Sequence, residues 1–171
     1  MIEPIYVIGA GLLGLILGSF LNALLYRYNT GRSVLRGRSR CMHCGHTLGA
    51  PDLIPLLSYA YLRGSCRYCR SRISLQYPAV EAVAAALSVL IYLQYQEPLH
   101  YALALAVWMV LLFIVVYDLR HQIIPWSASG LLALLSLMYV WFFGFGVWDF
   151  AAGPLLAAPL LLLSLVSGGR W

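Results

Sequence analysis

The sequence predicts an all-α polytopic membrane protein with five transmembrane helices and a polar loop subdomain between the first two. Of the 171 residues, 62% are hydrophobic and only 10% are charged, whereas soluble domains carry about a quarter charged residues and under half apolar ones. Five stretches reach the roughly 20 apolar residues that a helical span needs. The basic residues are unevenly distributed along the chain. Together these observations exclude a soluble globular domain and a disordered chain.

The predicted spans divide the chain into three regions. The spans cover residues 4–26, 79–95, 99–117, 126–146 and 150–167. Residues 1–26 form the first region, residues 27–78 a cysteine-containing loop, and residues 79–171 a membrane region of four helices. The loop is polar, rich in arginine and interrupted by glycine and proline. It is therefore interpreted as an inserted soluble subdomain with few large apolar side chains.

The arginines predict the orientation in the membrane. The chain has no lysine, and nine of its 11 arginines lie in residues 27–78, with Arg120 and Arg170 after the third and fifth spans. Basic residues concentrate in cytoplasmic loops, so alternating spans place the N-terminus outside and the loop in the cytosol. The arginine cluster is interpreted as a topology signal that also contacts anionic lipid, and not as a nucleic-acid surface.

Four cysteines in the loop predict a metal site. Two C-x-x-C pairs, Cys41 with Cys44 and Cys66 with Cys69, are separated by 21 residues. Two such turns supply the four thiolates of a structural Zn²⁺ site, and metal binding would provide folding free energy that the loop otherwise lacks. Two disulfides are the alternative, which a reducing cytosol disfavours. His43 and His46 are the less favoured substitute ligands. A closed four-cysteine site implies a structural metal.

The first span contains a misleading glycine pattern. Residues 9–14 match G-x-G-x-x-G, but no strand precedes them, as a dinucleotide site requires. Gly14 and Gly18 lie on one helix face, which predicts close helix packing. Ser19 and Asn22 are expected to hydrogen-bond neighbouring helices, with a substrate contact as the alternative.

A set of ordered blocks resembles a known family. They are GSFLN at 18–22, YR at 26–27, the two cysteine pairs, LLSY at 56–59, LRGSC at 62–66, ISLQYPAVE at 73–81 and DLRHQIIP at 118–125. In this order and spacing they resemble the bifunctional bacterial type IV prepilin peptidases. The resemblance implies a multi-pass inner-membrane enzyme of about eight spans. Such an enzyme cleaves prepilin or pseudopilin leaders after a glycine at the cytosolic face, then methylates the new N-terminus with S-adenosylmethionine.

The resemblance also implies functional residues. Asp118 matches the first catalytic aspartate, and aspartic proteolysis needs two carboxylates, one acting as base and one as acid. The second belongs to a G-x-G-D block that the 171 residues do not contain. Asp149 is interpreted as an external loop residue. We therefore expect a chain truncated before that block and inactive as a protease by itself.

Methyl transfer is expected to involve Arg63, Gly64 and Glu81, which lie in matching blocks. Glu81 has an alternative interpretation, because a carboxylate in the first turn of the second span also suits the positive end of a helix. Two other functions remain open: a methyltransferase-only homologue, and a non-catalytic zinc-knuckle membrane adaptor that binds pilin precursors.

Overall fold

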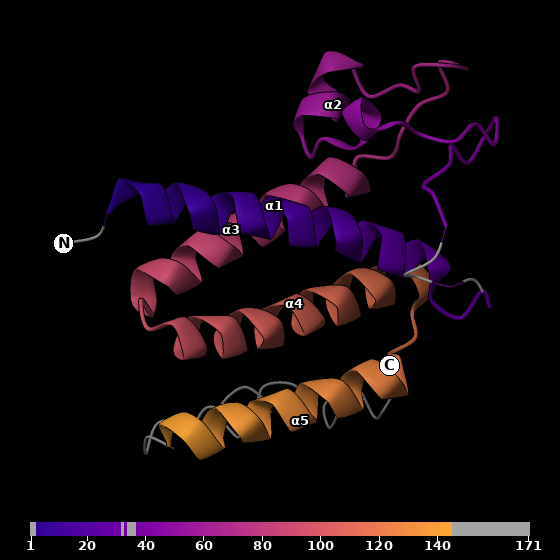
Figure 1. Cartoon of the computed structure of the whole chain (residues 1–171). Coiled ribbons are helices and arrows are strands. Elements are labelled where there is room, and N and C mark those ends of the chain that lie inside the picture. Colours follow the sequence, from indigo (N-terminus) through magenta and orange to yellow (C-terminus); the bar gives the residue numbers. More distant parts are fainter. Residues whose placement is uncertain (1–2, 32, 34–36, 145–171) are drawn as a thin grey trace, which may run out of the picture.

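The computed structural model describes residues 3–31, 33 and 37–144 (Figure 1). Its elements are α1 (Pro4–Arg27), the 3₁₀-helix η1 (Ala50–Leu53), α2 (Leu57–Tyr61), α3 (Gln76–Gln94), α4 (Pro98–His121) and α5 (Trp126–Phe143). Within the described residues there is no strand, only two isolated bridges in the loop. By length and composition, α1, α3, α4 and α5 could each cross a membrane. The all-α membrane class is confirmed, while the fifth predicted span, 150–167, lies outside the described residues.

A row of small residues lets α1 pack closely against α3. A Cβ placed on Gly14 would lie 2.6 Å from the carbonyl oxygen of Ala84, and one on Gly18 would lie 2.8 Å from the Cα of Glu81. The predicted packing role of these two glycines is confirmed. One turn to each side, polar groups join the helices: Ser88 Oγ donates to the carbonyl of Ala10 over 2.6 Å, and Asn22 Nδ2 donates to that of Tyr77 over 3.0 Å.

The remaining helices pack below this pair (Figure 1). Near the end of the bundle that carries Arg27, the buried side chains of Leu21, Leu25, Val80, Phe113, Tyr117 and Ala128 form one core cluster. Tyr28 seals it, with its ring edge-on to Phe113 and its hydroxyl hydrogen-bonded to Ser127 of α5. The C-terminal ends of α1 and α4 and the N-terminal ends of α3 and α5 therefore meet at one end of the bundle.

Three predicted boundaries need correction. The second span begins at Gln76, because Pro78 is tolerated in a first turn, where its missing N–H is not needed. Glu81 consequently lies in the second turn, which does not fit the alternative interpretation that places it in the first turn at the helix N-terminus. The third span continues through Asp118 to His121, since its last basic residues suit the negative end of a helix. The fourth ends at Phe143, where Gly144 has a φ of +79°.

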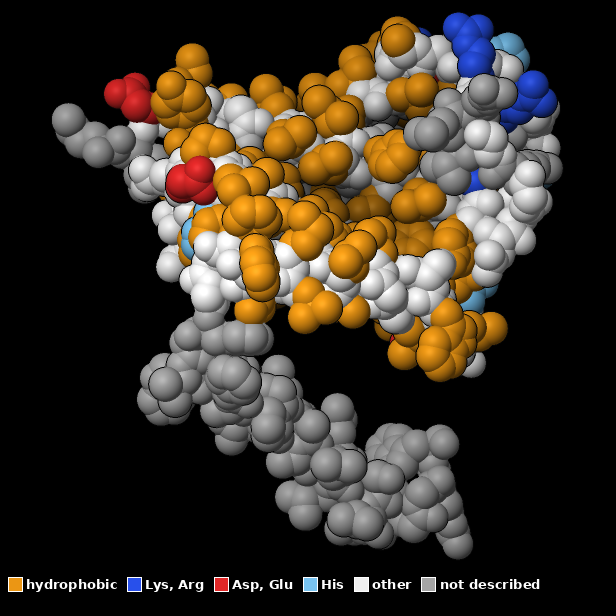
Figure 2. Space-filling model, turned by 60° about the horizontal axis from the view of Figure 1, so that its bottom comes forward, with side chains coloured by type: hydrophobic (Ala, Val, Ile, Leu, Met, Phe, Trp, Pro, Cys, Tyr) orange, Lys and Arg blue, Asp and Glu red, His pale blue; other side chains and the backbone are white. Residues whose placement is uncertain are grey.

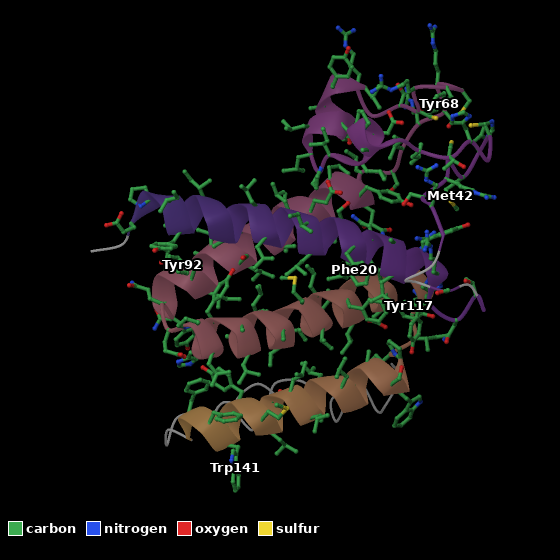
Figure 3. All side chains as sticks on the ribbon, viewed as in Figure 1. Phe20, Met42, Tyr68, Tyr92, Tyr117 and Trp141 are labelled. Atoms are coloured by element: carbon green, nitrogen blue, oxygen red, sulfur yellow. The ribbon has the colours of Figure 1, made fainter. Side chains whose placement is uncertain are left out.

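The outer surface of the bundle is apolar and its ends differ in charge. Figure 2 shows hydrophobic side chains spread over the helices, blue basic side chains at one end and acidic ones at the other. Trp141 points away from α5 into the surroundings (Figure 3). Monomeric soluble proteins rarely expose so large an apolar surface. The surface therefore fits contact with lipid.

Candidate functional site

Two turns of the same backbone shape hold the cysteines. In the first, Cys41 N–H donates to the carbonyl of His46 and Gly45 N–H to that of Cys41, each over 2.9 Å. The same two bonds recur 25 residues later: Cys66 N–H donates to the carbonyl of Ser71 and Arg70 N–H to that of Cys66, also over 2.9 Å. The bridges Arg40–Thr47 and Ser65–Arg72 flank the two turns at the same offset. The loop thus contains an internal structural repeat.

This repeat was not predicted from the sequence, since only the cysteines match between its copies. The position after each pair has a positive φ in both, +71° at Gly45 and +57° at Arg70. Glycine adopts that conformation without cost and arginine does not. The two turns therefore share a backbone conformation although a different residue type occupies this position in each. The signal available was the constant 25-residue offset between the two cysteine pairs.

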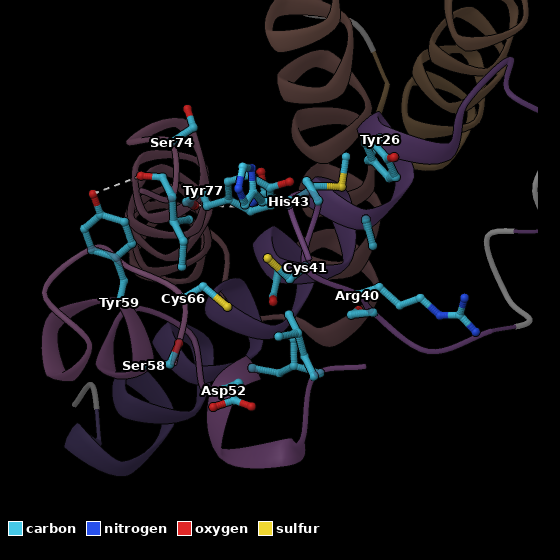
Figure 4. A pocket seen from close by; sticks show the side chains of 18 of the residues that line it. Tyr26, Arg40, Cys41, His43, Asp52, Ser58, Tyr59, Cys66, Ser74 and Tyr77 are labelled. Atoms are coloured by element: carbon cyan, nitrogen blue, oxygen red, sulfur yellow. Dashed lines mark hydrogen bonds between the residues drawn. The ribbon is translucent and has the colours of Figure 1, made fainter. Parts of the chain in front are cut away.

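The four thiols form a compact cluster whose dimensions suit a metal ion. All four sulfur atoms lie within 4.8 Å of one another, and the sulfurs of Cys41 and Cys69 are 3.8 Å apart. A tetrahedral zinc site with Zn–S bonds of about 2.3 Å has sulfurs separated by about 3.8 Å. Figure 4 shows Cys41 and Cys66, one from each turn, on the same side of the cavity described below. The residues present therefore fit a four-thiolate zinc site.

The ionisation of the thiols also favours a bound cation. A hydrogen bond from the backbone N–H of Cys44 lowers the pKa of Cys41 to about 6. The N–H of His46 favours the Cys44 thiolate, but burial and the interactions with Cys41 and Cys69 raise the pKa of Cys44 to about 11. Neighbouring thiolates repel one another, so all four ionise together only when a cation compensates their charge.

Asp52 ties the segment between the turns to the second turn. Its carboxylate accepts hydrogen bonds from Arg67 Nε over 2.7 Å, from Gly49 N–H over 3.1 Å and from Tyr68 Oη over 3.2 Å. Burial opposes ionisation, yet the Gly49 N–H and the Arg67 guanidinium hold the pKa of Asp52 below its usual value. His46 packs against Tyr68 with ring centroids 3.6 Å apart and ring planes tilted by 31°. The histidine therefore connects the two turns, and the cluster of possible ligands consists of the four cysteines.

A cavity of about 1200 Å³ lies between the cysteine loop and the membrane helices (Figure 4). Its wall combines one cysteine from each turn, Cys41 and Cys66, with Asn22 and Tyr26 of α1 and Glu81 of α3. Ligand pockets commonly have volumes of about 300–1,000 Å³. The cavity therefore has room for an organic cofactor together with part of a second molecule.

Of the three residues predicted for methyl transfer, Glu81 lines this cavity. Its side chain is buried, and its Oε2 accepts the N–H of Leu56 over 2.9 Å. Arg63 is exposed and, like Gly64, is absent from the cavity wall. Gly64 is instead packed under a wall residue: a Cβ there would lie 2.8 Å from the Tyr59 hydroxyl, and its φ is +68°. Gly64 therefore contacts the cavity wall through Tyr59 without lining the cavity itself.

Asn22 lines the cavity in addition to joining two helices. Its amide lines the cavity while remaining 4% exposed. The Tyr77 carbonyl accepts a hydrogen bond from the Asn22 side-chain N–H, which fixes the orientation of the amide. Among the described residues, the buried Oδ1 atom has no hydrogen-bond partner. The expected helix-to-helix bond is confirmed, and the Oδ1 atom lies buried behind the cavity wall.

Asp118 lies apart from these residues. It is exposed in the last turn of α4 and does not line the cavity, although Arg120, two residues later, does. The structure therefore brings Glu81, Cys41 and Cys66 around one space and leaves Asp118 outside it. The predicted external residue Asp149 lies outside the described residues.

Comparison with known proteins adds a family relationship. Residues 12–95 match the Bacterial Peptidase A24 N-terminal domain. The chain is 36% identical to the prepilin leader peptidase/N-methyltransferase of Myxococcus xanthus (strain DK1622), over 80% of this chain and 41% of that protein. It is 32% identical to the protein of that name from Dichelobacter nodosus, over 71% of this chain and 52% of that protein. It is 33% identical to the Pseudomonas putida protein of that name, over 85% of this chain and 58% of that protein.

The chain thus spans about half the length of the curated relatives it matches. No solved structure matches it.

Proposed function

Because the chain belongs to the bacterial prepilin peptidase family, we propose that it forms the N-terminal part of a prepilin leader peptidase/N-methyltransferase. In this proposal the loop and cavity serve methyl transfer to a processed pilin or pseudopilin, and Asp118 serves leader cleavage after a glycine. The supporting observation is the cavity itself, whose wall joins both cysteine turns to the buried Glu81. It provides a partly enclosed space in which a methyl donor and an amine could be held in line, as methyl transfer requires.

The loop residues would hold two bound groups. Zn²⁺ would be held by Cys41, Cys44, Cys66 and Cys69 and would stabilise the loop, since four thiolates leave no open coordination position. S-adenosylmethionine supplies an electrophilic methyl group when bound. Tyr26 and Tyr77 in the cavity wall offer aromatic faces to a cationic sulfonium.

Glu81 and its neighbours would position the acceptor amine. The Glu81 carboxylate is a hydrogen-bond acceptor in the cavity wall. An N-terminal amine donating to it would be held with its lone pair available to the methyl group. Gly64 would maintain this arrangement by allowing Tyr59 to pack against it, and Arg63 would act at the adjoining loop surface.

Asp118 would supply one of the two carboxylates of the peptidase. In such a pair, one carboxylate takes a proton from water and the other, protonated, polarises the scissile carbonyl. The concentration of basic residues at the Asp118 end of the bundle supports a cytosolic location for this end and an outside N-terminus. The proposed location is the bacterial inner membrane.

Methyl transfer from isotope-labelled S-adenosylmethionine to an already processed pilin tests the first activity. Glu81→Ala should abolish incorporation and Asp118→Asn should leave it unchanged; equal loss in both variants would contradict the separation of the two sites. Prepilin cleavage tests the second. The 171-residue chain alone is expected to release no leader, and product formation would show that the two-aspartate argument is wrong. A chain that binds prepilin but performs neither reaction would favour the adaptor.

A further inference from the structure

The segment 53–62, between the two cysteine turns, is unusually apolar for a loop. Its sequence is LIPLLSYAYL, in which Ser58 is the one polar side chain apart from the tyrosine hydroxyls. Residues 27–78 are predicted above to form a soluble subdomain with few large apolar groups, and this segment contradicts that prediction. Leu57 is 68% exposed and Tyr61 79% exposed, with Ile54 also exposed. In water, such exposure would be unfavourable.

Hydrogen bonds fix the position of this segment along the bundle. Leu56 N–H donates to Glu81, and the Cα of Glu81 lies against Gly18 of α1. Gly18 precedes Arg27, the last residue of α1, by nine positions, which at 1.5 Å per residue is about 13 Å along the helix. The side chain of a glutamate is shorter than that distance. Leu56 therefore lies beside the body of α1 and not beyond its end.

Figure 1 shows the same relationship: α2 stands alongside α1, short of the end that carries Arg27. Met42 and Tyr68 of the cysteine turns lie farther toward that end (Figure 3). Only part of the loop therefore projects beyond the bundle. The 24 residues of α1 extend about 36 Å, and a bilayer has a hydrocarbon core of about 30 Å. A centred α1 thus places Gly18 about 10 Å inside the boundary of that core.

We propose that residues 53–61 insert into the lipid leaflet beside α1 and α3, as an interfacial ledge that anchors the cysteine loop to the membrane. Leu57 and Tyr61 are its lipid contacts, since amphipathic interfacial segments bury their apolar faces about 5–10 Å into the headgroup and acyl boundary. This proposal does not depend on the proposed enzymatic function.

The charges around the ledge favour lipid as the occupant. Arg63 lies two residues after the end of α2 and is exposed. Residues 27–78 contain nine arginines and one acid, Asp52. A long arginine side chain beside an inserted segment can reach the phosphate level while its stem stays in apolar surroundings. The opposite neighbour of the ledge, Glu81, is buried and already hydrogen-bonded to the ledge backbone.

Nitroxide accessibility in vesicles tests the depth of the ledge. The full chain is reconstituted in phosphatidylethanolamine and phosphatidylglycerol vesicles. A ketone-bearing amino acid is labelled at position 57 or 61, which leaves the cysteines untouched. Collision with oxygen, which partitions into lipid, is compared with collision with a water-soluble nickel chelate. Ile16 on α1, 61% exposed, is the lipid reference, and Met42 in the first cysteine turn, 58% exposed, is the water reference.

The expected result is an oxygen-to-nickel ratio at positions 57 and 61 that is several-fold higher than at position 42 and close to that at position 16. A ratio at both positions equal to that at position 42 would overturn the proposal, as would lipid-like ratios at all four positions. Should a labelled chain fail to reconstitute, Leu57→Trp replaces it. Lipids brominated in the upper acyl chain must then quench the added fluorescence, and quenching by aqueous iodide alone would equally overturn the proposal.

Discussion

Glu81 on a membrane-spanning helix accepts the backbone N–H of Leu56 in the cysteine loop across 2.9 Å. Leu56 has a φ of +60° and a ψ of −46°, and Leu57 N–H donates to the Pro55 carbonyl over 2.6 Å. This is a γ-turn of the rare, strained hand. Such strain persists only where surrounding contacts determine the conformation. The Glu81 bond is one of those contacts, so it joins the loop to the helical bundle.

Removing the Glu81 acceptor should release this turn. Glu81→Ala leaves the Leu56 N–H without its partner, and we expect a loss of about 1–3 kcal/mol in the free energy of unfolding. Glu81→Gln keeps a side-chain oxygen and should lose much less. Thermal unfolding in detergent micelles measures both variants. Equal destabilisation by the two would mean that the negative charge matters and the hydrogen bond does not.

Gly64→Ala should destabilise the loop for two reasons. The φ of +68° disfavours any residue with a Cβ, and that Cβ would lie 2.8 Å from the Tyr59 hydroxyl. Gly45→Ala is the matched control, because Gly45 has a φ of +71° with no atom within 4 Å of the added Cβ. The control should cost about 1 kcal/mol, for the backbone conformation alone. Gly64→Ala should cost more, and Tyr59→Phe should partly rescue it; thermal unfolding of the double variant checks this.

Packing of α1 on α3 should tolerate no side chain at Gly14. An added Cβ there would lie 2.6 Å from both the Ala84 oxygen and the Ala85 Cα, which are backbone atoms. Gly14→Ala should therefore separate the helices and lower the midpoint of thermal unfolding. Gly9→Ala, on the same helix, has open space at the new Cβ and should leave the midpoint unchanged or raise it. A similar midpoint for both variants would contradict the packing described.

Metal analysis should find one zinc ion per chain. Replacing Cys41, Cys44, Cys66 or Cys69 singly with serine should abolish zinc retention during purification, since each thiolate completes the tetrahedral set. His46→Ala should retain zinc because His46 packs against Tyr68. A chelator should remove the metal and expose the loop to proteolysis. Zinc retention in a serine variant would indicate a different ligand set.

The Asp52 carboxylate should make loop stability sensitive to acid. Its pKa in the folded state is held below the unfolded value by the Gly49 N–H and Arg67, although burial opposes ionisation. The stabilisation is therefore present above the unfolded pKa of about 3.9 and is lost as the pH falls through the folded value. Asp52→Asn should reduce loop stability at neutral pH and remove this acid-dependent change. Limited proteolysis between pH 6 and pH 3 measures it, with Glu97→Gln, at the far end of the bundle, as the control.

The sequence by itself determined the membrane class, the approximate spans and the four cysteines that cluster. These features rest on composition, on runs of apolar residues and on the fixed spacing of C-x-x-C turns, all of which are local in the chain. The same local patterns placed Gly14 and Gly18 on a packing face. Helix ends were less well predicted: hydropathy marks where apolar residues stop, whereas the helix continues while its backbone bonds can form, as from Asp118 to His121.

Only the tertiary structure decided which distant residues share a space. It brought Asn22, Glu81 and the two cysteine turns around one cavity and left Asp118 outside its wall. It also placed Leu56 beside Gly18 by way of Glu81. These contacts join residues 25 or more positions apart in the chain, and they depend on how α1 and α3 pack. Sequence patterns report only local spacing. The depth of the ledge and the residues of the cavity wall are set by how the helices pack against one another.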